Sequence, residues 1–460
     1  MQRALLFKLI AILGLSVLIS IALAMINSTI EERAQFRQAA IDSIAKTNVR
    51  EQTITGPILV IRYTDEYEEE IAVADGQETR KQLVKRTLAA RHLVFPNELS
   101  IDSLFDTDRR HRGIHQVLVY SGKHKLTGNF IVPALADLPR TSTGSRLKLD
   151  RASIALGVSD VRGILNIPTI RLEDQEVEFQ QTTELAGVGS GMHANLEALN
   201  LDKSNRMAFA MQLDLDGIER QNFVPVGKNN KVHAKSAWPH PQFGGDFLPS
   251  VRDRTISDAG FDAKWQVSSL STTAQKQILD LENGASRDGP HAELESFSIG
   301  FVEPVNVYSL AERATKYGLL FIALTFAAFF MFEIIKRLPI HPVQYLLVGL
   351  ALAMFFLLMV SLSEHIAFAV AYLIASAACI ALIGFYLSYV LRNWKRGLGF
   401  AVALTALYGA LYGLLISESN ALVMGSILLF AVLAAVMVAT RKIDWYNIGK
   451  GDDAPMEVRG

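Results

Sequence analysis

Five long apolar runs make up almost all of residues 317–439, and they constrain the fold more than any other feature of the chain. The runs are Tyr317–Ile335, Val343–Leu362, Ile366–Leu391, Leu398–Ile416 and Ala421–Ala439. An α-helix needs about 20 mostly apolar residues to cross roughly 30 Å of hydrocarbon, so each run is long enough to span a bilayer. The connections between the runs are very short, which makes consecutive helices antiparallel neighbours. The sequence predicts a compact five-helix transmembrane bundle over residues 317–439.

A sixth apolar run, Leu9–Ile26, lies near the start of the chain. The segment Ala22–Ala24 has the small-x-small form that a signal peptidase accepts, so this run is either a retained anchor or a cleaved signal peptide. Retention is favoured because the apolar run continues beyond Ala24 and because Ser28 and Glu31 have the spacing of a capping box. We therefore expect a transmembrane anchor over residues 1–26 and a juxtamembrane helix over residues 27–52.

Basic residues alternate along the loops and predict the orientation of the spans, because Lys and Arg are retained on the cytoplasmic side. The loops rich in basic residues contain Arg3 and Lys8, Lys336 and Arg337, Arg392, Lys395 and Arg396, and Arg441 and Lys442. The intervening turns, which contain Glu364 and Glu418, have no Lys or Arg. Both termini are therefore expected in the cytoplasm, with a cytoplasmic tail over residues 440–460. Residues 27–316 are expected outside.

Short runs rich in β-branched residues, separated by polar turns and glycine, begin near Thr53. The clearest runs are Ile58–Tyr63, Arg91–Phe95, Gln116–Tyr120, Leu126–Val132, Ser153–Val158, Met207–Leu213 and Phe297–Phe301. No amphipathic helices of 10 to 15 residues alternate with them, which argues against a parallel α/β sheet. We predict a mainly β, sandwich-like extracytoplasmic domain over residues 53–316. The charged stretch Asp65–Lys85 is expected to form a solvated hairpin or loop.

Composition argues against several classes of function. A formal net charge of −1 without a basic face does not favour nucleic acid. Cys379, the only cysteine, lies inside an apolar run, so the outer domain has neither a disulfide nor a cysteine-based metal cluster. His111 and His115 are four residues apart, but they lie in a basic patch before a strand, which favours a surface turn over a metal site. Since catalytic and phosphate-binding signatures are also missing, we expect no metal or cofactor.

Two segments of the outer domain contain candidate binding residues. In Ser159–Gly163, the side chains of Asp160 and Arg162 point to the same side if the backbone is extended. They form either an ion pair that closes a turn or part of a binding site. The second segment, Trp238–Pro249, combines prolines, glycines and aromatic residues and contains Trp238, His240 and Asp246. This pattern predicts a rigid, packed loop, which is either a structural corner or a binding site.

The apolar runs contain few charged residues, which argues against an ion-coupled transporter. Glu333 lies one turn from Lys336, so pairing at the membrane surface explains its position. Gly409 and Gly413 form a small-x-x-x-small pair that predicts a close helix-packing face. That face is either internal to the bundle or joins another subunit, so an oligomer is possible.

Several segments are distinctive: Trp238–Pro241, Gly245–Pro249, Arg313–Tyr317, His341–Leu350, Leu362–His365 and Ser159–Gly163. At these segments most specifically, and over almost the whole chain from the N-terminal anchor to Tyr446, the sequence resembles the CreD inner-membrane protein family, also called the cell envelope integrity family. Ser159–Gly163 resembles an Asp-x-Arg-Gly element of the family. The resemblance implies a bacterial inner-membrane protein tied to envelope integrity and to a response governed by a two-component system. It implies no catalytic residues.

Two functions are consistent with these features. The first is a non-enzymatic role in envelope maintenance or stress adaptation, with the helices in the lipid bilayer and the outer domain binding an envelope component or a periplasmic protein. The alternative is a membrane enzyme or transporter acting on lipid or cell-wall precursors. The alternative requires Asp160, Arg162, His240 and Asp246 to converge in the folded chain.

Overall fold

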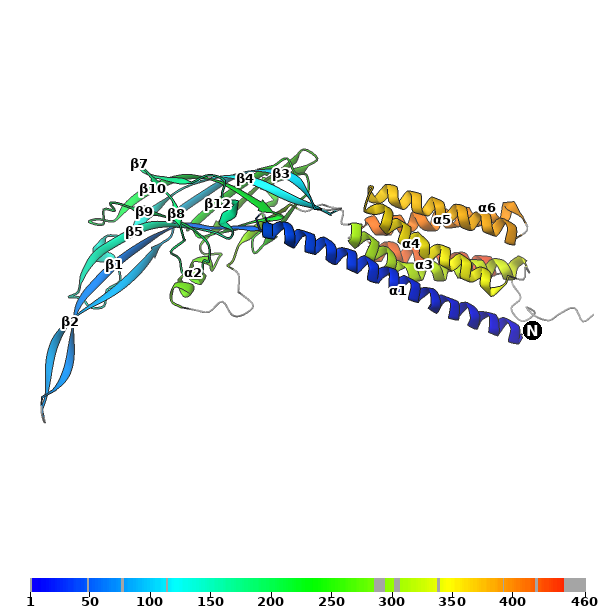
Figure 1. Ribbon diagram of the computed structural model, residues 1–460, viewed down its shortest axis with the longest axis horizontal. Helices are drawn as coiled ribbons and strands as arrows, with labels where there is room; N and C mark the ends of the chain where they lie inside the picture. The colour runs from blue at the N-terminus through cyan, green and yellow to red at the C-terminus, as the bar shows by residue number, and fades with distance from the viewer. Residues whose placement is uncertain are drawn as a thin grey trace, which may run out of the picture. The chain divides into compact units, whose positions relative to one another are not determined.

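A computed structural model describes the fold (Figure 1). The structure describes residues 2–47, 49–75, 78–112, 115–284, 294–301, 307–336, 340–391, 393–417 and 421–441. The chain divides into two compact units, a helical unit formed by residues 1–39 and 305–460 and a β domain formed by residues 40–304. The protein is therefore a membrane protein with helical spans and a mainly β domain.

The helices of the helical unit match the apolar runs of the sequence. They are α1 (Gln2–Thr47), α3 (Val307–Lys336), α4 (Pro342–Ser363), α5 (Phe368–Val390), α6 (Trp394–Ile416) and α7 (Ala421–Thr440). Within the described residues, α1 and α3 to α6 contain spans long and apolar enough to cross a membrane, and Val423–Ala434 of α7 is also apolar. One N-terminal and five C-terminal apolar helices are thus present, as predicted.

Local capping residues determine where two of these helices begin. Pro342 occupies the first turn of α4. Nδ1 of His341 accepts a hydrogen bond from the Val343 backbone N–H at 3.3 Å, and Oε1 of Gln344 accepts one from the His341 backbone N–H at 3.0 Å. The Asn393 side chain accepts a hydrogen bond from the Lys395 backbone N–H and begins α6. Both caps satisfy backbone donors that the first turn of a helix leaves without partners.

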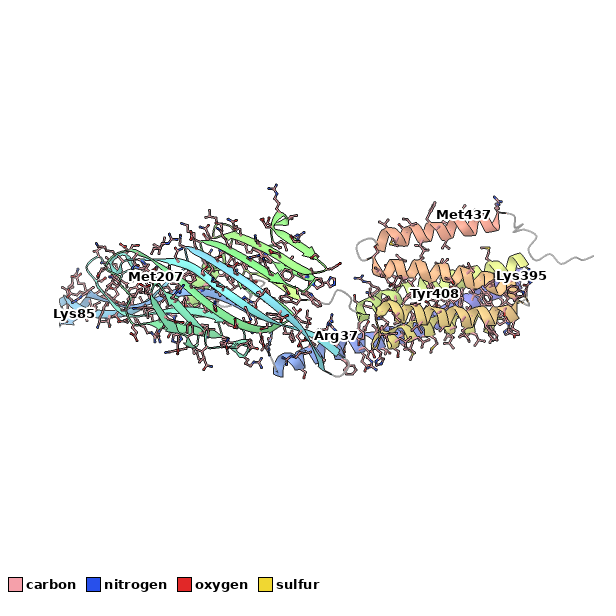
Figure 2. All side chains as sticks on the ribbon, turned by 90° about the horizontal axis from the view of Figure 1, so that it is seen from above. Arg37, Lys85, Met207, Lys395, Tyr408 and Met437 are labelled. Carbon is pink, nitrogen blue, oxygen red and sulfur yellow. The ribbon has the colours of Figure 1, made fainter. Side chains whose placement is uncertain are left out.

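The core of the helical unit is aromatic, and small residues allow close approach. Phe321, Phe355 and Tyr372 surround Tyr408, which Figure 2 shows midway along its helix. At Gly349 an added Cβ would lie 2.0 Å from Cδ1 of Ile19, so α1 packs directly against this glycine. Close packing of this kind stabilises helix contacts in lipid, where apolar burial gives little driving force.

The β domain consists of two sheets. The first follows the order β13 (Pro241–Gly245), β16 (Phe297–Phe301), β11 (Arg220–Val224), β1 (Gln52–Asp75), β5 (Arg146–Val158), β9 (Gly191–Leu196) and β8 (Gln180–Gln181), with β2 (Glu78–Val94) also paired to β1. The second follows the order β14 (Arg254–Ser257), β15 (Gly260–Ser268), β12 (Asn229–Ser236), β3 (Glu98–Arg112), β4 (His115–Val132), β10 (Asn205–Ile218), β6 (Thr169–Leu172) and β7 (Gln175–Glu178). Each described sheet is mainly antiparallel, and the pairs β1–β11 and β12–β3 are parallel.

Aromatic residues fill the space between the two sheets. Phe105 of the second sheet lies 5.1 Å, centroid to centroid, from Phe301 of the first, and Trp265 stacks on Phe297 at 5.2 Å. His124 is also in this interior, where it is 1 % exposed and accepts or donates one hydrogen bond with Ser103. The sandwich therefore has a continuous core without a disulfide.

The strands β1 and β2 form a long antiparallel ribbon that extends beyond the rest of the β domain (Figure 1). Figure 2 labels Lys85 on this ribbon and Met207 within the sandwich. Cross-strand ion pairs join Glu69 to Arg86 at 3.1 Å and Glu70 to Lys81 at 2.9 Å. The described parts of the charged stretch, Asp65–Asp75 and Glu78–Lys85, are thus paired strands of a hairpin.

The element boundaries differ from the expected ones in two places. α1 runs as one helix to Thr47, and the β domain begins at residue 40 within it. α3 begins at Val307, ten residues before the apolar run at Tyr317, because its first turns are polar but helical. Hydropathy locates the apolar part of a helix, whereas backbone hydrogen bonds determine its full length.

Candidate functional site

Asp160 and Arg162 form an ion pair in the short 3₁₀ turn η2 (Val161–Gly163). Asp160 is the residue before the turn, and its side chain accepts hydrogen bonds from the Arg162 backbone N–H and, at 2.9 Å, from the Arg162 Nε. Asp160 also accepts a hydrogen bond of 3.1 Å from the Arg50 backbone N–H, which lies just beyond α1. These hydrogen bonds, from Arg162 first, hold the pKa of Asp160 below its usual value. The carboxylate therefore stays charged and joins two distant segments of the chain.

Gln52 supports this turn from the interior of the domain, where it is 0 % exposed. Its Nε2 donates to the backbone oxygens of Asp160 and Asp216 at 2.9 and 3.0 Å. Its Oε1 accepts from the Asp160 backbone N–H at 3.2 Å and from the Ser159 hydroxyl at 3.2 Å. A fully paired amide of this kind fixes the position of the turn, because a buried polar group without partners is costly.

A pocket of about 460 Å³ lies beside this turn and is named here the Arg162 pocket. Its lining comes from the ends of β3, β4 and β10, from η2 and from Val49, two residues beyond the end of α1. The lining residues are Val49, Asp106, Thr107, Asp108, Arg110, Val119, Tyr120, Ser121, Arg162, Asp216 and Gly217. The pocket is therefore built from segments that are far apart in the sequence.

The Arg162 pocket presents both signs of charge. The guanidinium groups of Arg110 and Arg162 line it together with the carboxylates of three aspartates, including Asp216. Oδ1 of Asp216 is buried and has no hydrogen-bond partner among the described residues. Tyr120 donates from its hydroxyl to the Arg220 backbone oxygen at 2.8 Å, and burial raises its pKa well above the usual value. The pocket has the chemistry to hold a ligand that carries both an anionic and a cationic group.

The Trp238–Pro249 segment is held by its own local contacts. The indole Nε1 of Trp238 donates to the His240 backbone oxygen at 3.1 Å, and the two rings meet edge to face at 6.0 Å. The Asp246 carboxylate accepts a hydrogen bond of 2.9 Å from the Ser296 backbone N–H. Gly245 has φ of 80°, and an added Cβ would lie 2.3 Å from the Ser296 backbone oxygen, so only glycine fits there.

The four residues required by the enzyme alternative make contacts in two separate groups. Asp160 pairs with Arg162 and the chain near Gln52, whereas Asp246 pairs with the backbone of Ser296. Arg109 connects the regions only indirectly: it lies 5.6 Å from the Trp238 ring, while its neighbour Arg110 lines the Arg162 pocket.

Sequence reasoning did not identify Asp106, Asp108, Arg110 and Asp216 as candidate residues. A signal was present, because the segment Asp106–Arg110 is unusually charged for the end of a strand. Asp216 follows the alternating pattern of β10 and looks like an ordinary solvent-facing residue. Only the pairing of β3 with β4 and of β4 with β10 brings these side chains to one pocket.

The CreD family model, described as "Inner membrane protein CreD", matches residues 4–446. The chain belongs to the CreD family. It is also 34% identical to the inner membrane protein CreD of Escherichia coli over 446 residues, which cover 97% of this chain and 95% of the relative. The resemblance seen in the sequence is therefore confirmed, and the protein is a multi-pass protein of the inner membrane.

Two further matches cover less than half of this CreD-family chain. A terpene synthase 9 of Solanum habrochaites is 22% identical over 209 residues, which cover 42% of this chain and 37% of the relative. A crystal structure of a mutant M1 zinc metallopeptidase from Deinococcus radiodurans, bound to a peptide substrate, covers 45% of this chain and 42% of its own, at 9% identity and a TM-score of 0.22. Neither likeness supports an argument about chemistry. Among the described residues, no group of three or more His, Cys, Asp or Glu is arranged to hold a metal ion.

The packing role predicted for Gly409 and Gly413 in this CreD-family protein stays a prediction. An added Cβ at Gly409 would meet no atom within 4 Å, and one at Gly413 would meet only Cε of Met424 at 3.2 Å. Among the described residues, no neighbouring helix packs closely against Gly409, so an internal packing face is not seen there. The alternative of a face between subunits remains.

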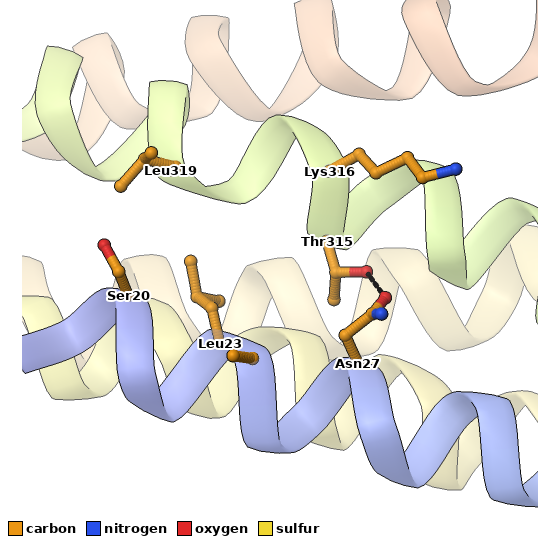
Figure 3. A pocket seen from close by; sticks show the side chains of 7 residues that line it. Ser20, Leu23, Asn27, Thr315, Lys316 and Leu319 are labelled. Atoms are coloured by element: carbon orange, nitrogen blue, oxygen red, sulfur yellow. Dashed lines mark hydrogen bonds between the residues drawn. The ribbon is translucent and has the colours of Figure 1, made fainter.

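Polar contacts join α1 to α3 and α4 within the helical unit. Thr315 of α3 donates to Oδ1 of Asn27 of α1 at 3.0 Å, at the edge of a groove of about 270 Å³ (Figure 3). Glu364 at the end of α4 accepts a hydrogen bond of 3.2 Å from the Tyr308 hydroxyl and pairs with Arg33 at 3.8 Å. These contacts tie α1, α3 and α4 together.

Proposed function

We propose that this protein helps to maintain the cell envelope, and that its β domain lies in the periplasm and binds an envelope component there. The Arg162 pocket is the observation that carries the proposal. It combines two guanidinium groups and three carboxylates in about 460 Å³, which suits a small zwitterionic group. The alternation of basic loops along the sequence supports a periplasmic β domain.

The chemistry of the pocket favours binding over catalysis. Both oxygens of the Asp160 carboxylate already accept hydrogen bonds, one from the Arg50 backbone N–H and the other from Arg162. A general base or nucleophile needs a free oxygen directed at the substrate. Arg110 lines the pocket, and Oδ1 of Asp216 has no hydrogen-bond partner among the described residues. A peptide with a free carboxylate and a free ammonium group, such as the stem peptide of peptidoglycan, matches this pair of charges.

The proposal is tested first in cells that lack the protein and are complemented with variants. The double variant Arg110→Gln and Asp216→Asn keeps side-chain size but removes one charge of each sign from the pocket. We expect it to allow uptake of a normally excluded dye under detergent stress, as the deletion does. The control Arg206→Gln changes an exposed arginine that pairs with Glu98 and does not line the pocket, and it should protect the cells as the wild type does.

A binding measurement tests the assignment of the Arg162 pocket separately from the role in the cell envelope. The full-length protein in lipid nanodiscs is titrated with a soluble disaccharide-tetrapeptide fragment of peptidoglycan by calorimetry. Loss of about tenfold or more in affinity in the double variant supports the pocket, because each charged hydrogen bond contributes about 1.5–3 kcal/mol. A deletion strain with an intact envelope under stress would refute the envelope role. A double variant that protects cells fully would refute the assignment of the pocket.

A further inference from the structure

Three arginines form a row across adjacent strands of the first sheet. Arg62 of β1 is directly opposite Arg91 of β2 on one side and directly opposite Arg151 of β5 on the other. Neighbouring strands lie about 4.8 Å apart, so the row places three like charges on one face within about 10 Å. Like charges directly opposite each other destabilise a sheet. The row therefore needs a compensating anion.

Glu184 supplies part of that compensation. Its carboxylate forms ion pairs with Arg151 and, at 3.4 Å, with Arg62, and its Oε2 accepts a hydrogen bond of 3.0 Å from the Ser153 hydroxyl. Its backbone oxygen accepts a hydrogen bond of 3.1 Å from Arg91. The Glu184 side chain is 11% exposed, so the carboxylate is mostly enclosed by the arginines.

The segment that carries Glu184 has a strained backbone. Thr182 has φ of 88° and Glu184 has φ of 59°, although neither is a glycine. Positive φ is unfavourable for a β-branched residue such as threonine, and such strain persists only where surrounding contacts impose it. The contacts of the Glu184 carboxylate with the arginines contribute to this constraint, together with backbone hydrogen bonds such as that from the Thr182 N–H to the Gly191 oxygen. The segment would relax if the carboxylate left the row.

The arginine row also has a donor that Glu184 does not satisfy. Nε of Arg62 is buried and has no hydrogen-bond partner within the described part of the chain. Arg91 has a second partner, because it pairs with Glu282 at 2.6 Å. The central arginine of the row is therefore the least satisfied of the three.

We propose that the row of Arg62, Arg91 and Arg151 is a binding site for a phosphate-type oxyanion, and that Glu184 occupies it as a tethered competitor. A guanidinium group matches the geometry of phosphate oxygens and binds them in a bidentate manner. A phosphate with three oxygens satisfies donors that the two oxygens of one carboxylate leave unpaired. Its arrival displaces Glu184 and relaxes the strained segment. This site is separate from the Arg162 pocket and does not depend on the function proposed for it.

The test titrates the full-length protein in lipid nanodiscs with inorganic pyrophosphate at fixed ionic strength. Glu184→Gln keeps the side-chain size but removes the competing charge, so we expect it to bind about tenfold more tightly than the wild type. Arg62→Gln should abolish most of the pyrophosphate binding, both in the otherwise wild-type protein and in the Glu184→Gln variant. Arg171→Gln, at an exposed arginine of β6, is the matched control and should bind like the wild type.

A second variant and a second measurement keep the proposal testable if Glu184→Gln does not fold. Ser153→Ala removes one hydrogen bond to the Glu184 carboxylate and should raise the affinity for pyrophosphate by a smaller factor. Hydrogen exchange of residues 182–190 should become faster when pyrophosphate binds the wild-type protein, because Glu184 is displaced. Equal affinity in the wild type, Glu184→Gln and Arg62→Gln, or unchanged exchange at saturation, would overturn the proposal.

The source of the phosphate is distinguished by a second ligand. Glucosamine 1-phosphate presents the same oxyanion on a sugar, as phosphorylated envelope glycans do. Tighter binding of this sugar phosphate than of inorganic phosphate, dependent on Arg62, would support the site and assign it to a glycan. Equal binding of the two would support the site and assign it to free phosphate.

Discussion

The β domain and the helical unit bury polar groups in different ways. In the β domain, buried side chains join segments that are far apart in the sequence, as Gln52 does with Asp160 and Asp216. In the helical unit, hydroxyls mostly bond to their own helix, as Thr325 does with the Phe321 backbone oxygen at 2.8 Å. Helices satisfy their backbone groups internally, whereas a sandwich relies on pairing between distant strands. Polar chemistry that can bind a ligand is therefore concentrated in the β domain.

The largest expected effect comes from Gln52→Leu, which tests whether the interior network stabilises the β domain. The substitution removes the side-chain hydrogen bonds to the backbone oxygens of Asp160 and Asp216 and to the Asp160 backbone N–H, although the Asp160 oxygen keeps its hydrogen bond from the Gly163 backbone N–H. Each group that loses its partner costs about 1–3 kcal/mol, so we expect the β domain to lose about 2–5 kcal/mol of stability. Denaturant unfolding of the purified protein measures the loss. Gln212→Leu, at an exposed position of β10, should change the stability little.

A smaller effect is expected from pH, through His124. Burial lowers the pKa of His124 to about 3 from its usual value of 6.5. Below pH 6.5 the unfolded chain binds a proton that the folded domain does not, so the stability falls as the pH falls until about pH 3. The slope is about 1.4 kcal/mol per pH unit, which gives a loss of about 2 kcal/mol between pH 7.5 and pH 5.

Unfolding of wild type and His124→Gln at the two pH values measures this linkage. Glutamine does not titrate but can still form a hydrogen bond with Ser103. The variant should therefore lose less stability than the wild type over the same pH interval. An identical loss in both proteins would show that other groups control the acid sensitivity.

In the helical unit, Tyr345→Phe is expected to have a more modest effect. The Tyr345 hydroxyl donates to the buried Glu333 carboxylate at 2.8 Å and joins α4 to α3. Hydrogen bonds between membrane helices contribute about 0.6–2 kcal/mol, and thermal unfolding of the bundle in detergent should reflect a loss of that size. Tyr389→Phe, whose ring is 71% exposed, is the control. If Tyr345→Phe lost more stability than Gln52→Leu, the β domain would not depend more strongly on its buried polar contacts than the helical unit does.

The smallest effect is expected on the β1–β2 ribbon. Arg86→Gln removes an exposed cross-strand ion pair with Glu69 and should cost less than about 1 kcal/mol. Arg91→Gln on the same strand removes a pair with Glu282, whose side chain is 9% exposed, and should cost more. Denaturant unfolding of both variants compares the exposed pair with the enclosed one. Equal losses would indicate that burial does not control the strength of these pairs.

The helical spans could be predicted closely because each depends on the composition of one continuous segment. Val343–Leu362 was expected and α4 spans Pro342–Ser363, with its start fixed by a local cap at His341. The strands were also found, but Gln116–Tyr120 and Leu126–Val132 are parts of the single strand β4. The glycine and charged residues between the two runs resemble a turn in the sequence. In the structure, backbone pairing with β3 and β10 continues through them and makes β4 a single strand.

The candidate sites were less predictable because they depend on contacts across the sequence. Asp160 and Arg162 were singled out from a local pattern, and the structure places them beside a pocket whose other charges come from β3 and β10. The row of Arg62, Arg91 and Arg151 has no local pattern at all. Each of these arginines lies in a different strand, and only the register of β1 with β2 and β5 brings them together.

The sequence by itself determined the membrane spans, the mainly β character of the domain between them and membership of the CreD family. Those properties follow from local hydropathy, from strand propensity and from similarity along the chain. Only the tertiary structure decided which strands are neighbours and in which register, and therefore which charges meet. A shift of one residue in register would move a side chain to the other face of the sheet, so no property of a single segment could have specified the Arg162 pocket or the arginine row.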